Sequence, residues 1–271
     1  MDLGLQGKAA LLVGAGRGLG AAAALALARE GCKVALVART RTSVEARAAE
    51  CRSAGAKLAL GICADATDAA QLAALIERAA SELGSLDILV NLVGGSEPGG
   101  TDGEMWERAF DRNLWPAVRA SRLALPHLSA SAQRRALNRS SEPLEQPGGD
   151  ASVIVHVASI FGREGGGALS YNVAKAALIS LAHEQARELA PRGIRVLSVA
   201  PGSILHQGGS WERRLQTEPA ATRAFVQREI PFGRFGTANE VGEVIAFLCS
   251  PRASWVAGAC IVVDGGQSRS F

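Results

Sequence analysis

Short apolar runs, rich in β-branched residues and bounded by turn residues, recur along the whole chain. They lie at residues 8–14, 33–38, 57–62, 86–91, 152–159, 194–201 and 259–266. Their length and composition are typical of strands that are buried on both faces of a sheet. Longer helical stretches separate them, among them 18–31, 68–84 and 171–193, of which the last is closed by Pro191 and Gly193.

This alternation of strand and helix constrains the topology more than any other feature. Consecutive strands can run parallel only through crossovers, which are right-handed and place helices on both faces of the sheet. Seven strands in one wound sheet account for all 271 residues and leave no stretch for a second domain. We therefore predict an α/β fold in a single domain, residues 1–271: a doubly wound, seven-stranded parallel sheet of the Rossmann type, flanked by helices.

Two segments interrupt the alternation. Residues 129–150, SASAQRRALNRSSEPLEQPGGD, are polar and contain two prolines and a Gly-Gly pair, which predicts a mobile surface insertion; a charged docking surface is the alternative. Residues 203–236 follow the carboxyl end of the sixth strand, at the edge where open α/β sheets bind ligands. We predict that they form a helical lid over a substrate.

Composition excludes several other classes of protein. Hydrophobic residues make up 48 % of the chain and charged residues 20 %, which is typical of a globular protein. The formal net charge is only +3, and no dense Lys/Arg stripe with interleaved aromatic residues points to nucleic acid. No signal peptide is recognisable, and no run reaches the roughly 18 apolar residues of a membrane helix. Five widely spaced cysteines fit reduced thiols better than disulfides or a zinc site, so we expect a cytoplasmic protein without a metal.

A glycine-rich stretch, VGAGRGLG at residues 13–20, follows the first strand directly and opens the first helix. Gly14 suits the tight turn, and Gly20 permits the helix to pack closely on the sheet. Gly16 and Gly18 lack a Cβ that would keep a pyrophosphate away from the backbone, and the N-terminus of the helix adds N–H groups and the positive end of its dipole. Such a turn can be no more than a tight strand–helix connection, but in this context it predicts a dinucleotide cofactor.

The end of the second strand indicates which dinucleotide fits. An acidic residue there would bind the adenosine ribose hydroxyls and repel a 2′-phosphate, but the chain has Ala38, followed by Arg39 and Arg41. Arg17 in the glycine loop is a third candidate, since a guanidinium can hold a phosphate with two hydrogen bonds. Each arginine alone can be a solvated surface residue; together they favour NADP(H) over NAD(H). Asp65, after the third strand, can bind the adenine amino group or merely cap the next turn.

The only tyrosine, Tyr171, is followed four residues later by Lys175, one of four lysines. Chance alone gives such a pair about 1–2 % of the time in a chain of this composition. The spacing places both side chains over one face of a helix. We expect the ammonium to lower the pKa of the phenol, which can then donate a proton to the alkoxide that develops when a ketone receives a hydride. Ser159, at the end of the fifth strand, can hold the carbonyl, unless it is only a serine at a turn.

Four further motifs follow the order found in a known family: LVNLVGG (89–95), DRNLWP (111–116), VAPGSI (199–204) and VVDGG (262–266). Together with VGAGRGLG and SYNVAK, they make the chain resemble the short-chain dehydrogenase/reductase family over nearly its whole length. The stretch from RFGTANEVGEVIAFLCSP through VVDGG is similar to the 3-oxoacyl-carrier-protein reductase-like branch of that family.

The resemblance implies roles for individual residues. Ser159, Tyr171 and Lys175 would be catalytic, and Asn113 would complete a proton relay with Lys175 through water. Asn91 would stabilise the central strand. The cofactor-binding residues that we expect, with Pro201 and Gly202 bordering the nicotinamide, are Gly14, Gly16, Arg17, Gly18, Leu19, Gly20, Arg39, Asp65, Ala66, Asn91, Gly94, Tyr171, Lys175, Pro201, Gly202 and Ile204.

The sequence departs from the family pattern at positions that concern the cofactor and the substrate. Val13 replaces the usual threonine before the glycine loop, and NLVG replaces Asn-Asn-Ala-Gly. The interval from Ser159 to Tyr171 is one residue shorter than is common. His206 stands where a threonine usually approaches the cofactor carboxamide; it is either a nicotinamide or substrate contact or part of a solvated loop. Four apolar residues of the lid either line a pocket or hold the lid together: Trp211, Leu215, Phe225 and Phe232.

These features predict an NADPH-dependent oxidoreductase that reduces a ketone or 3-oxoacyl-type carbonyl reversibly to a secondary alcohol, with Tyr171 as the proton donor. One alternative is an NAD-linked dehydrogenase of a sugar or secondary alcohol. Another is a non-catalytic sensor or scaffold, which the intact catalytic set disfavours. The expected partners are a small carbonyl or alcohol substrate and further copies of the chain, because relatives are commonly homotetramers; a homodimer is the alternative. No nucleic acid or membrane partner is expected.

Overall fold

The computed structural model describes residues 2–95, 103–137 and 151–270. Its centre is a sheet of seven parallel strands in the order β3-β2-β1-β4-β5-β6-β9. The strand order reverses between β1 and β4: β2 and β3 lie on one side of β1, and β4 and the later strands lie on the other. The strands are β1 (Ala9–Val13), β2 (Lys33–Ala38), β3 (Ala59–Cys63), β4 (Ile88–Asn91), β5 (Ser152–Val157), β6 (Ile194–Pro201) and β9 (Cys260–Val263). The predicted doubly wound, seven-stranded parallel sheet is confirmed.

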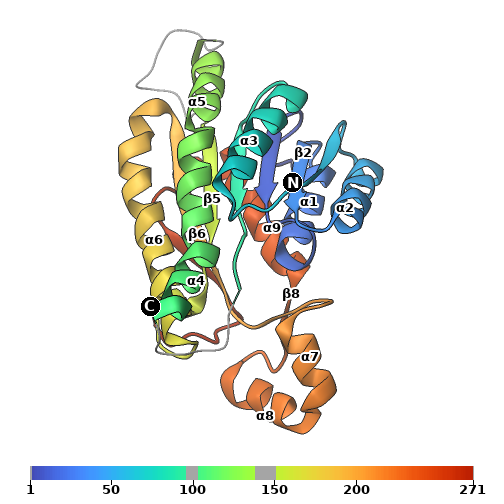
Figure 1. The fold of residues 1–271 in the computed structure, drawn as a ribbon, viewed down its shortest axis with the longest axis vertical. Helices are drawn as coiled ribbons and strands as arrows, with labels where there is room; N and C mark the ends of the chain where they lie inside the picture. The colour runs from blue at the N-terminus through green and yellow to red at the C-terminus, as the bar shows by residue number, and fades with distance from the viewer. Residues whose placement is uncertain (1, 96–102, 138–150, 271) are drawn as a thin grey trace.

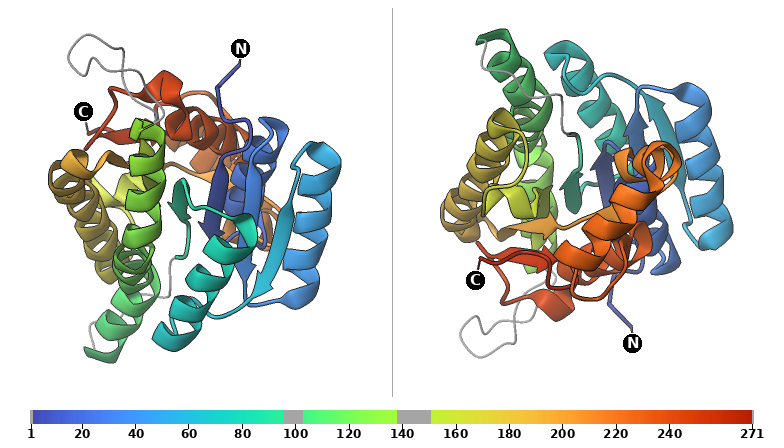
Figure 2. Two further views of the ribbon diagram at one scale, coloured as in Figure 1. Left: turned by 90° about the horizontal axis from the view of Figure 1, so that it is seen from above. Right: turned by 90° about the horizontal axis from the view of Figure 1, so that it is seen from below.

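Helices cover both faces of this sheet (Figure 1). They are α1 (Gly18–Arg29), α2 (Arg41–Ala54), α3 (Ala69–Leu83), α4 (Gly103–Asn113), α5 (Trp115–Leu137), α6 (Leu169–Leu189), α7 (Ser210–Thr217), α8 (Pro219–Glu229) and α9 (Ala238–Cys249). Helices α1, α2 and α9 pack on one face, and α3, α5 and α6 pack on the other, as the two views of Figure 2 show. The strands and helices named from the sequence agree with these bounds to within about one helical turn.

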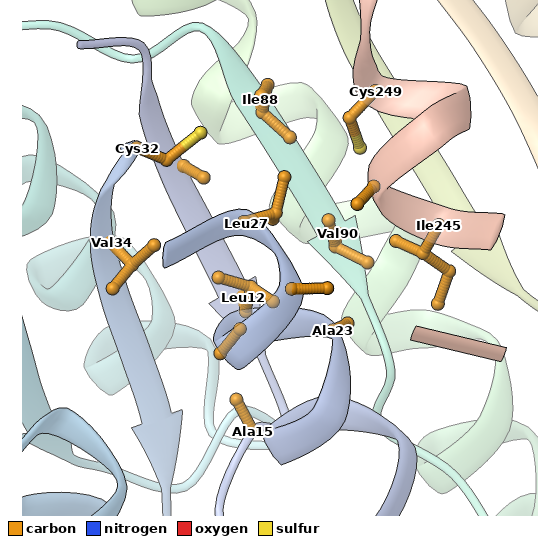
Figure 3. Packing of buried hydrophobic residues seen from close by; sticks show 14 of the residues in the cluster. Leu12, Ala15, Ala23, Leu27, Cys32, Val34, Ile88, Val90, Ile245 and Cys249 are labelled. Atoms are coloured by element: carbon orange, nitrogen blue, oxygen red, sulfur yellow. The ribbon is translucent and has the colours of Figure 1, made fainter. Parts of the chain in front are cut away.

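The core consists of two apolar layers, one on each face of the sheet. Successive residues of β1 point to opposite faces, so Ala10 and Leu12 join one layer whereas Leu11 and Val13 join the other. Figure 3 shows the first layer, in which Leu12 lies between the sheet and helices α1 and α9. Because both faces are covered, the strands read as continuous apolar runs rather than as an alternation of apolar and polar residues.

Residues 203–236 form the helical segment that the sequence predicts. The segment contains α7 and α8, and two short parallel strands, β7 (Ile204–Leu205) and β8 (Gly236–Thr237), pair at its base. Trp211 stacks on Phe225, with ring centroids 4.6 Å apart. Figure 1 shows α7 and α8 projecting beyond one end of the sheet. We call residues 203–236 the lid segment below.

The predicted surface insertion at 129–150 is wrong for its first part, because helix α5 runs into it as far as residue 137. Arg135, in the last turns of this helix, forms an ion pair with Asp87 and donates a hydrogen bond to Ser152 Oγ (2.8 Å). These tertiary contacts hold in a helix a polar stretch that the sequence pattern assigned to a loop. The rest of the predicted insertion, residues 138–150, lies outside the described residues.

The five cysteines are free; Cys32, Cys51 and Cys249 are buried, Cys260 is partly buried and Cys63 is exposed. Burial raises the pKa of the Cys51 thiol to about 11 and that of the Cys249 thiol to about 12, so both stay protonated at neutral pH. Within the described ranges, no helix has the length and apolar character that a membrane crossing requires.

Arg195 on β6 fastens the end of helix α9 to the sheet. Its buried guanidinium donates hydrogen bonds to the carbonyl oxygens of Leu248 (2.9 Å), Ser250 (3.1 Å) and Val256 (2.9 Å). The last carbonyls of a helix have no intrahelical donor and form the negative end of its dipole. One buried cation therefore satisfies three acceptors, of which the Leu248 and Ser250 carbonyls are buried and the Val256 carbonyl is partly buried.

Replacing Arg195 by methionine keeps an apolar stem but removes all three donors. We expect the Arg195→Met variant to lose about 2–4 kcal/mol of the free energy of unfolding, because buried carbonyls lose their partners. Urea denaturation followed by circular dichroism measures the loss. Arg192→Met is the matched control, since Arg192 is exposed three residues earlier. Equal stability of the two variants would contradict this role.

Candidate active site

The predicted functional residues gather at the carboxyl edge of the sheet, where the strand order reverses between β1 and β4. Open α/β sheets bind ligands at such a switch point. Two cavities adjoin there: one of about 690 Å³ beside the glycine loop, and one of about 520 Å³ between α6 and the lid segment. Leu92 and Gly94, just after β4, line both cavities, so the two are joined. We call them the cofactor cavity and the substrate cavity.

The glycine loop forms a cradle that a side chain would fill. The amides of Gly14 and Ala15 donate to the carbonyl of Val37 (3.0 and 2.8 Å), which anchors the loop to β2. A Cβ on Gly16 would lie 2.7 Å from the Cβ of Ala38. The N-cap residue of α1, Arg17, makes no capping hydrogen bond with its side chain, whereas Asp68 caps the N-terminus of α3. The free backbone donors at this helix end fit the diphosphate of a dinucleotide.

The part of the cofactor cavity beside the ends of β2 and β3 contains most of the residues that the sequence singled out for binding adenosine. Arg17, Ala38, Arg39, Asp65 and Ala66 all line it. The Asp65 carboxylate accepts hydrogen bonds from the Thr67 amide (2.9 Å) and hydroxyl (2.8 Å), and these bonds lower its pKa. The capping role of Asp65 is therefore observed, although its side chain also faces the cavity.

Arg41 does not line the cofactor cavity; on α2 it pairs with Glu45 at 3.6 Å. Ser43 was not expected from the sequence, but its hydroxyl donates to the Gly16 carbonyl (2.5 Å) and lines the cavity. Three charged residues of α4 also line the cofactor cavity and were not expected there from the sequence: Arg108, Asp111 and Arg112. No local motif marks these residues, because only the packing of α2 and α4 brings them to the glycine loop.

Tyr171, Lys175 and Ser159 meet in the substrate cavity. Tyr171 and Lys175 lie one turn apart on α6, with the lysine Nζ 5.7 Å from the centroid of the phenol ring. Lys175 Nζ donates to the carbonyl of Val157 (3.0 Å). Ser159 follows β5 and lines the cavity with Tyr171, and its hydroxyl accepts a hydrogen bond from the Phe161 amide (3.2 Å).

The expected lowering of the Tyr171 pKa by its neighbouring lysine is wrong. Burial raises the pKa of Tyr171, and the hydrogen bond from Ser159 opposes this effect only in part. Lys175 is itself buried, and burial, together with the nearby charge of Arg112, lowers its pKa to about 8. The physical reason is desolvation, which disfavours phenolate and ammonium alike. Tyr171 is therefore a phenol, a proton donor, at neutral pH.

Asn113 lies behind Gly94 rather than on the cavity wall. Its Oδ1 accepts from the Gly95 amide (2.9 Å), and its Nδ2 donates to the carbonyls of Gly95 (3.2 Å) and Ala109 (3.0 Å). A Cβ on Gly94 would lie 2.8 Å from both Asn113 Oδ1 and Lys175 Nζ. Asn113 and Lys175 thus enclose the turn after β4, and Asn113 fixes its backbone.

Asn91 lies inside the sheet, as the resemblance implies. Its Nδ2 is 3.2 Å from Nδ1 of His156 on the adjacent strand β5, and His156 Nε2 is 3.0 Å from Gln185 Oε1. Burial lowers the pKa of His156 to about 4, so the ring is neutral, donates to Gln185 and accepts from Asn91. Asn91 is absent from the lining of both cavities.

The lid segment contacts the glycine loop through His206. A Cβ on Gly18 would lie 2.9–3.0 Å from three atoms of the His206 ring, and the ring also borders the substrate cavity. Pro201, Gly202 and Ile204 line the same cavity, as does Leu19. His206 is therefore part of the site rather than of a solvated loop.

Of the four apolar lid residues, two line the substrate cavity and three help to hold the lid segment together. Trp211 and Phe225 line the substrate cavity and also pack in the apolar cluster of the lid segment, to which Leu215 belongs. Phe232 is 74 % exposed and lies outside the cavity.

Comparisons with known proteins agree with this geometry. A family model described as Enoyl-(Acyl carrier protein) reductase matches residues 14–268. The chain is 35 % identical over 269 residues to cis-4-hydroxycyclohexanecarboxylate dehydrogenase of Sinomonas cyclohexanicum, covering 96 % of each chain. It is 31 % identical over 269 residues to the 3-oxoacyl-acyl-carrier-protein reductase FabG of Escherichia coli (strain K12), covering 98 % of this chain and 99 % of the other.

Among solved structures, L-sorbose reductase from Gluconobacter frateurii, complexed with NADPH and L-sorbose, is similar over 100 % of both chains, with a TM-score of 0.87 and 27 % identity. The family model, over residues 14–268, covers the chain from the glycine loop through the lid segment to the last strand. The chain therefore belongs to the short-chain dehydrogenase/reductase family, similar to its 3-oxoacyl-acyl-carrier-protein reductases, and is an oxidoreductase acting on a carbonyl or alcohol group.

Proposed function

We propose that the protein is an NADPH-dependent reductase that converts a ketone, of the 3-oxoacyl or a related type, to a secondary alcohol, and catalyses the reverse reaction. The observation that supports this most directly is the junction of the two cavities. The wall formed by Leu92 and Gly94 belongs both to the cavity with the phosphate-binding cradle and to the cavity with Tyr171. A dinucleotide laid along the glycine loop would reach the proton donor through this junction.

Different side chains of the substrate cavity would have different roles in the reduction of a carbonyl. A bound nicotinamide would supply the hydride. Ser159 and Tyr171, which line the same cavity, would hold the carbonyl oxygen, and Tyr171 would donate its proton to the developing alkoxide. Lys175, with a pKa lowered to about 8, would return a proton to the phenol. Pro201, Gly202 and the lid segment would exclude water from one side of the cavity.

The choice of NADPH rests on charge. Arg17 and Arg39 line the cofactor cavity at the end of β2, where Ala38 leaves no carboxylate to repel a 2′-phosphate. Two guanidinium groups at one site favour a phosphate over a bare ribose hydroxyl. An NAD-linked dehydrogenase would need these arginines to be irrelevant to the cofactor. Assembly as a homotetramer, which rests on the resemblance alone, and a cytoplasmic location, which rests on the cysteine pattern, are also part of the proposal.

Tyr171→Phe tests the proton donor. We expect kcat/KM for carbonyl reduction to fall by about 10²–10⁴-fold, because the phenol oxygen is the acid of the reaction. NADPH affinity, measured by quenching of protein fluorescence, should change less than about three-fold. Turnover near the wild-type rate would rule out this mechanism, and loss of NADPH binding would mean that the variant is disturbed beyond the proton transfer.

Arg39→Ala tests the cofactor preference, with Arg41→Ala as the matched control. We expect the KM for NADPH to rise about 10–100-fold in Arg39→Ala, while the KM for NADH changes little, because a charge-assisted contact to phosphate is lost. Arg41→Ala should behave as the wild type with both cofactors, since Arg41 pairs with Glu45. Steady-state rates at 340 nm measure both. A wild-type enzyme that uses NADH and NADPH equally well would refute the NADPH assignment.

Lys175→Met tests the cost of the buried ammonium. The pKa of Lys175 is about 8 in the fold against about 10.4 unfolded, so at pH 7 burial of the charge destabilises the fold. We expect Lys175→Met to lose activity but to gain about 1–2 kcal/mol of unfolding free energy at pH 7. The gain should shrink as pH rises from 8 to 10.5, because the wild-type lysine then folds uncharged. Urea titrations across this range measure it; a pH-independent difference would contradict the shifted pKa.

A further inference from the structure

The substrate cavity has an unbalanced charge. Its described lining includes the catalytic groups and one further cation, Arg214 of α7, but no aspartate or glutamate. The cofactor cavity differs, since Asp65 and Asp111 line it beside the arginines. An anionic group on a substrate would therefore meet a cation and no opposing carboxylate in the substrate cavity.

Arg214 is exposed, and its guanidinium stacks on an aromatic ring of the lid segment. Its guanidinium carbon lies 5.3 Å from the centroid of the Trp211 ring, one helical turn earlier on α7. Trp211 is itself fixed by Phe225 and by Phe235, whose ring centroid is 4.9 Å away. Among the residues that the structure describes, no carboxylate forms an ion pair with Arg214.

This stacking suits the recognition of a carboxylate. A guanidinium on an aromatic ring uses its face for the cation–π contact, which leaves the N–H groups along its edge for a planar, two-pronged acceptor. Phe161, Trp211 and Phe225 add apolar surface to the lining of the same cavity. The cavity, about 520 Å³, has the size of a small-molecule site.

We propose that the substrate is a small oxo acid, with an apolar body between its ketone and its carboxylate, and that Arg214 determines this specificity by binding the carboxylate. The proposal rests on the proposed function, because it places the ketone at Tyr171 and Ser159. It goes further by naming the class of substrate and the lid residue that selects it. The stacked pair of Trp211 and Arg214 makes the lid segment both a wall of the cavity and its anion-binding group.

The test compares oxo acids with their methyl esters, which keep the shape but lose the charge. The series comprises 4-oxopentanoate, 5-oxohexanoate, 7-oxooctanoate and 4-oxocyclohexanecarboxylate. For the acid whose length fits, we expect the wild type to prefer acid over ester by at least about ten-fold in kcat/KM. Arg214→Met should reduce this acid-to-ester ratio to near one, and Arg214→Lys should keep part of it, since a lysine retains the charge but not the two-pronged geometry.

Arg213→Met is the matched control. Arg213 precedes Arg214 on the same helix and is exposed, as Arg214 is, but it does not line the cavity. We expect it to keep the wild-type ratio; an equal loss in both variants would mean that only the general charge of the lid matters and would overturn the proposal. Acetoacetyl-CoA is a further arm, because its phosphates lie on a long carrier. Dependence on Arg214 for that thioester, but for none of the oxo acids, would also overturn it.

A binding measurement separates this proposal from the proposed function. Calorimetric titration of the protein in the presence of NADP⁺ with cyclohexanecarboxylate, and with its methyl ester, needs no turnover. We expect Arg214→Met to weaken binding of the acid by at least about ten-fold relative to wild type and Arg213→Met. If no ketone is reduced with either cofactor but this difference is found, the proposed reaction fails and the anion site stands. If ketones are reduced but acid affinity is unchanged in Arg214→Met, the site fails and the reaction stands.

Discussion

Seven strands that run in the same direction place all their carboxyl ends at one edge, and the functional site depends on that alignment. The ladder between β1 and β4 sets the glycine loop beside the turn that holds Gly94. The ladder between β4 and β5 sets that turn beside Ser159. Helices cover both faces, so the inner strands β1, β4, β5 and β6 are buried along their whole length. Because the strand order reverses between β1 and β4, the helices diverge there and leave the two joined cavities.

Desolvation governs the chemistry of the groups within this site. The same burial lowers the pKa of Lys175, raises that of Tyr171 and keeps His156 neutral. For a reductase the consequence is useful, because a phenol that stays protonated is an acid and a lysine with a pKa near 8 can exchange protons at physiological pH. The protein therefore holds a charged group where it is unfavourable for folding, which is common where function and stability compete.

Much of the fold could be predicted because its signals are local. A strand buried on both faces reads as an apolar run, and a glycine-rich loop between a strand and a helix is typical of a phosphate-binding turn. The failures involve contacts between distant segments. Arg135 joins the end of α5 to Asp87 and Ser152, and no local pattern reveals such a partner. Arg39 and Arg41 look equivalent in the sequence, but only Arg39 faces the cofactor cavity.

The sequence by itself determined the parallel sheet, the phosphate cradle and the pairing of Tyr171 with Lys175, because periodicity and short spacings decide which residues share a strand, a loop or a helix face. Only the tertiary structure decided how these groups titrate and what lies across the cavity from them. The shifted pKa values arise from burial, which depends on the whole fold. Arg214 lines the cavity in a fold in which Trp211, one turn earlier on α7, packs in the apolar cluster of the lid segment. A contact between segments far apart in the chain exists only once both have folded against the same core.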